Sequence, residues 1–446
     1  MLSLIISGCA AHAPLVRLDP TLRAPQCISR VRIFDGRSEQ RSEPSDVTLA
    51  FGRIESIQPA APTVDPACLE GEGKTLLPGL IDSHAHVGLG GGLPPWEPRL
   101  PDTARHLEMF LFSGVTSVLV ASGSEELAEA MELEGSPHVF RASRVVTAKE
   151  GHPIPMYKSL LFWPLTSIFI PQGVIEVETD ADVVPVITTE LASGVDFIKV
   201  VYDSMPPGGP HLTQHQLERL IAEARQRGAR VVVHAGSAQE AVEATEAGAS
   251  LLMHVPWEDL LSDDDVRRIA ATRVPLVTTR HVFGAIDEVA KGTLRLHPLE
   301  RRLSDGAGDS FSQRPKDFAP PGFDATFEAN LAIYDRNLGQ NVKKLFDAGV
   351  TLLVGTDAGL PGVFQGASIH RELQTLVELG LPPVEVLRSA TSTPARFLDP
   401  ARHFGVIEPG AVADLLLVEG DPLQDIAATE HIVAAWKSGL RVERRP

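Results

Sequence analysis

Residues 228–254 have the sequence GARVVVHAGSAQEAVEATEAGASLLMH, in which two short apolar runs flank an amphipathic segment. That segment ends at Ala247-Gly248, and a glycine in this place commonly closes a helix because it adopts the left-handed backbone conformation. The apolar runs leave no polar face for water, which is typical of parallel strands buried on both sides. The stretch therefore predicts a strand, a helix and a second strand in succession.

The same succession of helix, glycine and apolar run recurs along the chain, at Gly114, Gly194, Gly228 and Gly349. The strands that it predicts are residues 76–87, 115–121, 139–147, 196–202, 230–235, 251–255, 275–279 and 351–356. Eight parallel strands that alternate with helices close into a (β/α)8 TIM barrel, whose chemistry lies at the carboxyl ends of the strands. The predicted fold class is therefore α/β.

Further strands are predicted on both sides of the barrel, where short apolar runs alternate with turn-rich polar stretches. They are residues 31–34, 47–50, 53–57, 413–418 and 431–436. We expect the two ends of the chain to join in a small β-sandwich domain. The expected division is a signal-like or disordered N-terminus at 1–24, the first part of the β domain at 25–77, the barrel at 78–399 and the second part of the β domain at 400–446.

The composition argues against several classes of function. The 446 residues carry a formal net charge of -18, whereas a surface that binds nucleic acid needs cations to neutralise phosphates. No apolar run reaches the ~20 residues that are needed to cross a bilayer. We therefore expect an enzyme with a small-molecule substrate, without a nucleic-acid partner or a transmembrane segment. Whether it forms a homo-oligomer stays open.

The N-terminus contains a short apolar run, Leu2–Ile6, followed by Ser7-Gly8-Cys9. Small residues before a cysteine are typical of bacterial lipoprotein signals, in which that cysteine is lipidated, although the usual basic segment is absent here. This pattern predicts a periplasmic protein or a lipoprotein anchored to the membrane through Cys9. A cytoplasmic protein is the alternative.

Cys27 and Cys68 are the two other cysteines of the chain. After export they would mature in an oxidising compartment, where a structural disulfide persists. A disulfide between them is one hypothesis, and two unpaired thiols are the other.

Histidines stand at the carboxyl ends of several predicted strands. His84 and His86 are two residues apart, so on a strand both side chains point to one side, here the barrel interior. His234 and His254 end two further strands at the same level. A single histidine there would more often be a packed core residue. Together these imidazoles match the ligands that zinc and similar divalent ions favour.

Asp357 and Lys199 complete the candidate site. Asp357 follows the last predicted strand, where it can coordinate a metal and accept a proton; an N-cap or turn is its alternative role. Lys199 lies in the apolar run Phe197–Val201, and a lysine on such a strand is costly unless something neutralises or uses it. A buried salt bridge is the alternative explanation for Lys199.

These motifs follow one another in an order that is typical of one enzyme family. They are LPGLIDSHAH at 77–86, GVTSV at 114–118, GH at 151–152, DFIKV at 196–200, GTDA at 355–358 and ATSTPA at 390–395. The chain resembles the amidohydrolase superfamily from about residue 25 to the C-terminus. Within it, the chain is similar to imidazolonepropionase-like proteins and Xaa-Pro dipeptidases.

The resemblance implies two divalent metal ions, zinc in the first place, with manganese, iron and cobalt as alternatives. The ligands that it implies are His84, His86 and Asp357 for the more buried ion, His234 and His254 for the more exposed ion, and a carboxylated Lys199 that bridges the two. It implies a metal-dependent hydrolase that uses a metal-bridging hydroxide on a carbon–nitrogen bond of an amide or dipeptide-like substrate, cyclic amides included. Asp357 would be the general base and then the general acid.

Differences from some members of the superfamily indicate which branch the chain resembles. Members that resemble adenosine deaminase carry a glutamate three residues after the histidine of strand five and lack the lysine; here that position is Ser237. Lys199 therefore favours the two-metal branch. Hydrolysis of a lactone, an ester or an organophosphate at the same site is the alternative. A non-enzymatic barrel that binds a metal or ligand is a third hypothesis, which the retention of all the ligand positions disfavours.

The substrate is less well defined by the sequence. His152, in the loop after the third strand, and Tyr202, just beyond Lys199, are candidates for hydrogen bonds to it. A histidine that faces water and a tyrosine that fills the barrel rim are the alternatives. Two connections, residues 151–182 and 280–345, are long enough to form lids over the site.

Overall fold

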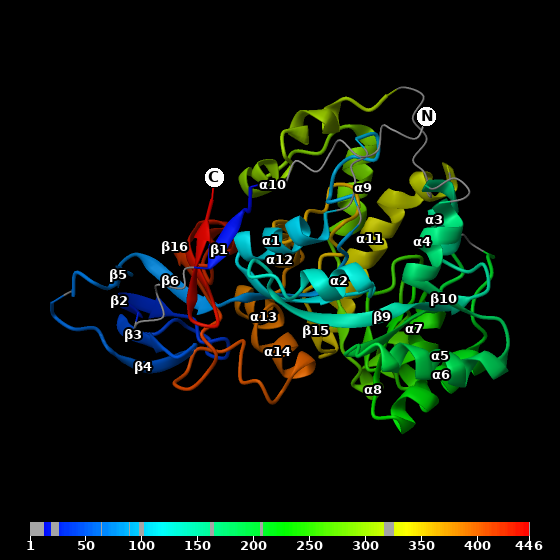
Figure 1. Ribbon diagram of the computed structural model, residues 1–446, viewed down its shortest axis with the longest axis horizontal. Coiled ribbons are helices and arrows are strands. Elements are labelled where there is room, and N and C mark those ends of the chain that lie inside the picture. Colours follow the sequence, from blue (N-terminus) through cyan, green and yellow to red (C-terminus); the bar gives the residue numbers. More distant parts are fainter. Residues whose placement is uncertain are drawn as a thin grey trace.

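The computed structural model of the protein describes residues 13–18, 26–63, 65–88, 90–97, 102–160, 165–205, 208–315 and 325–445. In these residues the strands form two sheets, each of nine strands. One sheet belongs to a small β domain at one end of the molecule, and the other is surrounded by helices (Figure 1). Cys9 and its apolar run lie outside the described residues.

The helix-covered sheet is the predicted barrel. Its strands are β7 (Leu80–Ala85), β8 (Val115–Val120), β9 (His138–Ala148), β11 (Phe197–Val201), β12 (Arg230–His234), β13 (Leu251–Leu252), β14 (Leu276–Val277) and β15 (Leu352–Leu353), with β10 (Val174–Val177) paired to β9. All neighbouring strands are parallel. The first and last strands meet through the Ser83 N–H, which donates to the Val354 carbonyl at 2.9 Å. The (β/α)8 fold is therefore confirmed.

The predicted strand 76–87 is two strands, which corrects one detail of the sequence analysis. β6 (Lys74–Pro78) pairs with the small sheet, and β7 starts the barrel after a single residue, Gly79. The Gly79 N–H donates to the Asp414 carbonyl at 2.9 Å, and a Cβ at this position would collide with the Thr116 side chain. Only glycine lets the chain pass so closely from one sheet to the other.

The barrel interior is apolar below the level of the histidines. Each barrel strand contributes to one buried cluster, which α14 closes from below. Its members from the strands include Ile81, Leu119, Phe140, Phe197, Val232, Leu251, Val277 and Leu353. On β11, Phe197 belongs to this inner cluster, whereas Ile198 and Val200 belong to the outer core that faces the helices. Alternation along the strand therefore turns Lys199 into the barrel.

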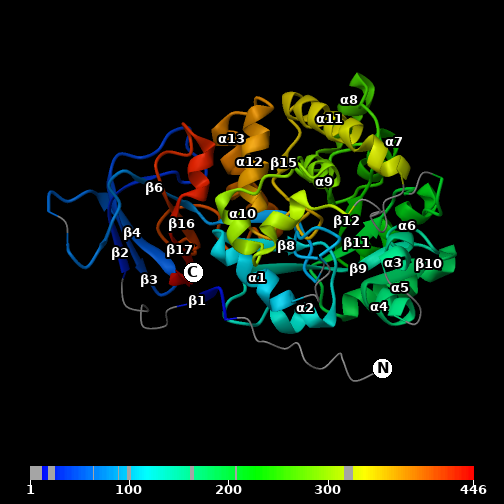
Figure 2. The same ribbon diagram turned by 90° about the horizontal axis from the view of Figure 1, so that it is seen from above.

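Helices cover the outside of the barrel (Figure 2). They are α1 (Thr103–Phe112), α2 (Glu125–Ala130), α3 (Ile154–Leu160), α4 (Leu165–Gly173), α5 (Val183–Ala192), α6 (Gln214–Gln226), α7 (Ala238–Glu246), α8 (Asp263–Thr272), α9 (Val282–Lys291), α10 (Pro298–Leu303), α11 (Ala325–Asp347), α12 (Ser368–Glu378), α13 (Pro383–Ser389) and α14 (Ser392–Leu398). The two long connections therefore contain helices, α3 and α4 in the first and α9 to α11 in the second. Among the described helices, none combines the length and the apolar character that crossing a bilayer requires.

The small domain unites both ends of the chain, as predicted. Its strands follow the order β1 (Val16–Leu18), β18 (Leu440–Arg444), β17 (Ile432–Lys437), β16 (Leu415–Glu419), β6, β2 (Gln26–Ile33), β3 (Ser45–Ala50) and β4 (Arg53–Pro59), with β5 (Leu69–Glu70) paired to β2. β1 falls within the segment 1–24 that was expected to be signal-like or disordered, yet it pairs with β18, Val16 opposite Arg444. The folded domain thus begins before residue 25.

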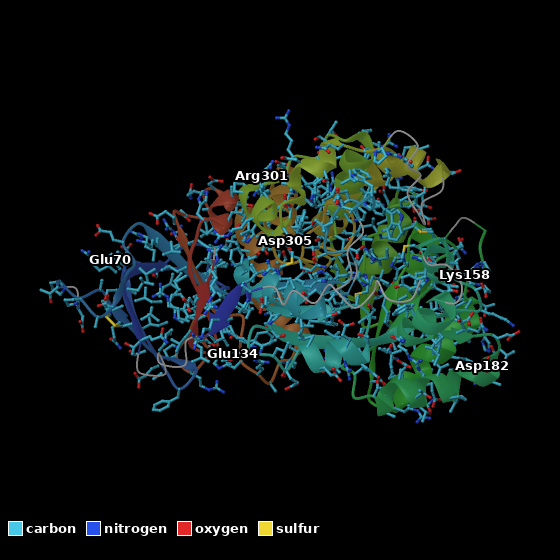
Figure 3. All side chains as sticks on the ribbon, turned by 45° about the horizontal axis from the view of Figure 1, so that its top comes forward. Glu70, Glu134, Lys158, Asp182, Arg301 and Asp305 are labelled. Carbon is cyan, nitrogen blue, oxygen red and sulfur yellow. A yellow bond between two sulfur atoms is a disulfide. The ribbon has the colours of Figure 1, made fainter. Side chains whose placement is uncertain are left out.

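A disulfide joins Cys27 on β2 to Cys68, just before β5. Figure 3 shows it as a yellow bond on the side of the molecule that carries Glu70. The two cysteines are 41 residues apart in the chain, so the bond ties the start of β2 to the segment that leads into β6.

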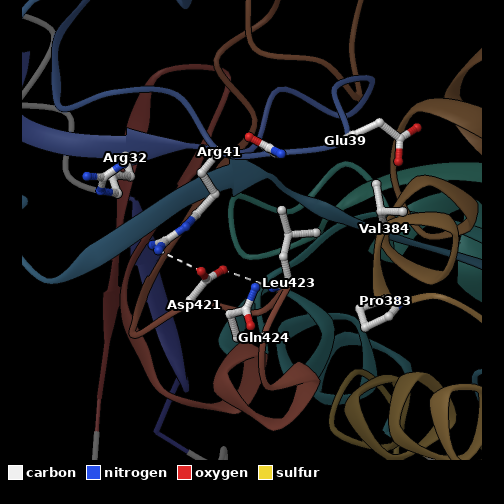
Figure 4. Close-up of a pocket in the computed structure, with 9 residues that line it drawn as sticks. Arg32, Glu39, Arg41, Pro383, Val384, Asp421, Leu423 and Gln424 are labelled. Carbon is white, nitrogen blue, oxygen red and sulfur yellow. Dashed lines mark hydrogen bonds and ion pairs between the residues drawn. The ribbon is translucent and has the colours of Figure 1, made fainter.

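Polar contacts and a pocket lie where the small domain meets α13. Arg41 forms an ion pair with Asp421 at 2.6 Å, and Pro383 and Val384 of α13 face it across a cavity of about 340 Å³ (Figure 4). None of the residues that line this cavity belongs to the histidine cluster. We assign the cavity to the domain junction.

The disulfide should stabilise the small domain. Because it restricts the unfolded chain, Cys27→Ser is expected to lower the free energy of unfolding by about 2–4 kcal/mol. Urea denaturation without reductant measures this, and the wild-type protein with reductant is the control, which should approach the variant. Equal stability of the two proteins without reductant would contradict the prediction.

Candidate metal centre

The seam that closes the barrel brings three predicted ligands together. His84 Nε2 and His86 Nε2 lie 3.1 Å and 3.2 Å from the same oxygen, Oδ1 of Asp357. The backbone supports this arrangement, because the Asp357 N–H donates to the His84 carbonyl at 2.8 Å. His84 and Asp357 are buried, and His86 is partly exposed. One ligand atom from each residue lies within 4.8 Å of the others.

Asp357 has an unusual backbone for a residue other than glycine. Its φ is 57°, in the left-handed region, where such strain often accompanies a functional role. Asp82 braces the turn from below, since its carboxylate accepts hydrogen bonds from the Thr356 N–H at 3.0 Å and the Thr356 hydroxyl at 2.6 Å. Asp82 also accepts from the His84 N–H at 3.2 Å, so one buried side chain fixes both strands of the seam.

His234 and His254 extend the cluster around the barrel. The His254 ring centroid lies 4.5 Å from that of His84 and 4.6 Å from that of His234. Thr279 Oγ1 lies 2.9 Å from His254 Nδ1, which leaves Nε2 of that ring as the available ligand atom. Trp257 packs edge-on against both rings, with its centroid 5.3 Å from each. Their orientations are thus held by packing as well as by hydrogen bonds.

His254 reaches the site because its strand is short. Leu251 and Met253 both belong to the inner cluster, so strict alternation would turn His254 outward. β13 ends at Leu252, however, and the chain bends at residues 253 and 254. This bend returns the imidazole to the interior.

Lys199 lies inside the barrel beside these histidines and is 2% exposed. Burial lowers the pKa of its amine to about 7, against the raising effect of Asp357 and Asp203. Burial also lowers the pKa of His84 to about 3, and the nearby charge of Lys199 contributes. Among the described residues no ion pair engages the Lys199 amine, so the salt bridge considered as its alternative role is not formed there.

The donor set fits divalent metal ions. His84 Nδ1 and Nε2 are buried and make no hydrogen bond within the described part of the chain, although Nε2 is close to Asp357. Imidazole and carboxylate atoms that converge without bonding one another are what a zinc-like ion requires. Burial acts to raise the pKa of Asp357, but the nearby imidazoles of His84 and His86 hold it well below its usual range. The carboxylate therefore stays ionised.

The two candidate substrate ligands lie in different places. His152 Nδ1 is 2.9 Å from both carboxylate oxygens of Asp203, and its ring centroid is 5.2 Å from that of His234, so it borders the cluster. Tyr202 is on the outer face of the barrel wall, where its hydroxyl donates to Glu243 of α7 at 2.6 Å. The assignment of Tyr202 to the substrate was wrong, because Tyr202 is out of phase with Lys199 on the strand.

Asp203 is a buried residue of the site that the sequence analysis missed. It accepts from His152, and its Oδ2 also lies 2.8 Å from His234 Nε2. Burial acts to raise the pKa of Asp203, but both histidines hold it well below its usual range. Its position directly beyond β11, at the carboxyl end of a barrel strand, was the available signal.

The profile of the Amidohydrolase family matches residues 75–442, most of the chain. The chain belongs to this family. It is therefore a hydrolase, and its barrel is the fold of an amidohydrolase. Imidazolonepropionase of Geobacillus kaustophilus (strain HTA426) is 24% identical to this amidohydrolase over 360 residues, which are 78% of this chain and 76% of the relative.

Solved structures agree with the fold. A Xaa-Pro dipeptidase with bound methionine in its active site superposes with a TM-score of 0.75 at 22% identity, covering 94% of this chain and 99% of that one. Ochratoxinase of A. niger superposes with a TM-score of 0.70 at 18% identity, covering 93% and 95%. At such low identities these likenesses establish the architecture and leave the substrate to be tested.

The closing seam should tolerate no added bulk. A Cβ at Gly355 would lie 2.8 Å from the His84 backbone nitrogen and collide with Val277, so Gly355→Ala must push β15 away from β7. We expect the substitution to cost about 1–3 kcal/mol of stability and to weaken metal binding. Thermal unfolding and metal analysis measure both. Gly173→Ala, which meets no atom within 4 Å, is the control, and the same behaviour in both variants would refute the argument.

Proposed function

We propose that this amidohydrolase cleaves a carbon–nitrogen bond in a small amide or dipeptide-like substrate, cyclic amides included, with two divalent ions. One observation carries the proposal: imidazoles, a carboxylate and a buried amine from separate strands converge at the carboxyl end of one barrel. The names of the imidazolonepropionase relatives and of the Xaa-Pro dipeptidase neighbour support carbon–nitrogen bonds as the target.

The proposed ligands fall into two groups. His84, His86 and Asp357 would hold one ion, and His234 with His254 the other. Zinc fits this nitrogen-rich set, with manganese, iron and cobalt as alternatives.

Lys199 would serve both ions as a carbamate. A neutral amine reacts with carbon dioxide, and the burial that lowers the pKa of Lys199 to about 7 keeps part of it neutral near that pH. The carbamate would replace a costly buried cation with an anionic oxygen ligand.

Asp357 is proposed to move the proton. Bound divalent ions would polarise the substrate carbonyl and lower the pKa of a water molecule. Asp357 Oδ1 is occupied by His84 and His86, while no hydrogen bond engages Oδ2 in the described part of the chain. Oδ2 would therefore accept the proton of the water and later donate it to the leaving nitrogen, which cannot depart as an anion.

His152 is proposed to contact the substrate. Asp203 occupies its Nδ1, and among the described residues nothing bonds Nε2, so this nitrogen is available to a substrate oxygen. The ring lies beside His234, next to the second group of ligands.

A substrate panel tests the function. Metal-loaded protein should hydrolyse members of a chiral dipeptide, N-acyl amino acid and cyclic amide library faster than lactones, esters or phosphotriesters. Preference for the second panel would replace the proposal with hydrolysis of those centres. Asp357→Asn protein, purified in parallel, shows whether any turnover comes from a contaminant.

Asp357→Asn should separate chemistry from metal binding. The amide oxygen can still face His84 and His86, but it cannot take up a proton, so kcat should fall by about 10²–10⁴-fold or more. Metal analysis of the variant should still find bound ions. Near-wild-type kcat would refute the proton-transfer role.

Lys199→Ala should lose metal and activity together, since it removes the proposed bridge. Lys437→Ala is the control, because burial also lowers the pKa of the partly exposed Lys437, but its amine donates to the Ser136 carbonyl. Metal uptake by the wild-type apoprotein should in addition require bicarbonate. Full metal content in Lys199→Ala would contradict the bridging role.

We also propose export, with lipidation at Cys9 and a periplasmic or membrane-anchored location. The disulfide between Cys27 and Cys68 supports an oxidising compartment. Fractionation of the native host after labelling with a fatty-acid analogue should place the label on the wild-type protein and not on Cys9→Ser. An unlabelled cytoplasmic protein would contradict export.

A further inference from the structure

Asp203 connects a proposed metal ligand to the proposed substrate contact. Its side chain has no solvent exposure, and its Oδ2 lies 2.8 Å from His234 Nε2 and 2.9 Å from His152 Nδ1. Its Oδ1 is also 2.9 Å from His152 Nδ1. The two rings come from different elements, His234 from the end of β12 and His152 from the loop after β9.

The distances around Asp203 are those of hydrogen bonds. They are the lengths expected when N–H groups donate to a carboxylate.

Because a carboxylate can only accept hydrogen bonds, Asp203 determines which ring nitrogens of His234 and His152 carry hydrogens. Both nitrogens that face Asp203 must be donors, so His234 carries its hydrogen on Nε2 and His152 carries one on Nδ1. The lone pair of His234 is then on Nδ1, as a metal ligand requires. His152 keeps Nε2 for the substrate.

We propose that Asp203 is a positioning residue that sets the tautomer of His234 for the second metal ion and the orientation of His152 toward the substrate. The part about His152 rests on the proposed function, whereas the part about His234 concerns metal binding alone. Loss of Asp203 should therefore weaken one ion selectively. Carboxylates that orient metal-binding histidines commonly change metal affinity or activity by about 10–100-fold.

Asp203→Asn tests the metal part. The affinity for the ion at His234 and His254 should fall by about 10–100-fold, while the ion at His84, His86 and Asp357 keeps its affinity. Titration of apoprotein with cobalt, followed by absorption and by metal analysis after dialysis, resolves the two steps without any substrate. Equal affinities in variant and wild type, or parallel loss at both steps, would overturn the inference.

Asp414→Asn is the matched control. Asp414 is also a buried aspartate, 3.2 Å from His138 Nε2, but it lies at the junction with the small domain. If loss of any buried aspartate–histidine pair merely loosened the fold, both variants would lose metal alike. We expect Asp414→Asn to retain both titration steps.

Kinetics at saturating metal test the part about His152. Asp203→Asn should then still lower kcat/KM, and the same substitution in a His152→Ala background should have little further effect. Full additivity of the two substitutions would show that Asp203 does not act through His152. If the protein hydrolyses none of the tested substrates, the cobalt titration still tests the role of Asp203 in metal binding.

The tautomers of His234 and His152 can also be measured in the wild-type protein, whose folding no substitution disturbs. With ¹⁵N-labelled histidine, the spectrum of the apoprotein should contain a ring protonated on Nε2 for His234 and a ring protonated on Nδ1 for His152, assigned by His234→Asn and His152→Ala. The opposite tautomer at either ring would refute the positioning role.

Discussion

Hydrogen bonds between the first and last barrel strands hold the centre together. The Ser83 N–H and the Asp357 N–H each donate across the seam between β7 and β15, at 2.9 Å and 2.8 Å. These two strands are far apart in the sequence, and only closure of the barrel brings His84 and His86 to Asp357. Asp82 and Gly355 serve the same seam, one by bonding both strands and the other by leaving room for them.

The barrel interior is divided into an apolar lower layer and a polar upper layer that carries the candidate ligands. In the lower layer, side chains such as Phe197 and Val232 fill the space and contribute to the core. Two residues further along the same strands, Lys199 and His234 belong to the upper layer. Burying an amine and several imidazoles there lowers the free energy of unfolding unless ligands bind them. The polar layer therefore destabilises the fold, and its presence is explained by function. Thr279, Asp203 and Trp257 limit the freedom of those rings.

Much of the fold could be predicted from local sequence patterns, because parallel strands that are buried on both faces need nearly continuous apolar runs. The histidines could be assigned for the same reason: they stand where apolar runs end. Asp203 also follows an apolar run, but its proposed role depends on contact with His152 from the loop after β9, and no local pattern reports that contact. Tyr202 was misassigned because nearness to Lys199 in sequence was given more weight than strand alternation. Gly79 divides a single apolar run between two sheets, and only the packing of Thr116 reveals why.

The proposed metal centre holds a pair of cations among these side chains. X-ray absorption of the metal-loaded protein measures this most directly. We expect a first shell of nitrogen and oxygen with the multiple scattering of imidazoles, and a metal–metal distance of about 3.5–4 Å. A shell without imidazole, or a single ion in fully active protein, would contradict it.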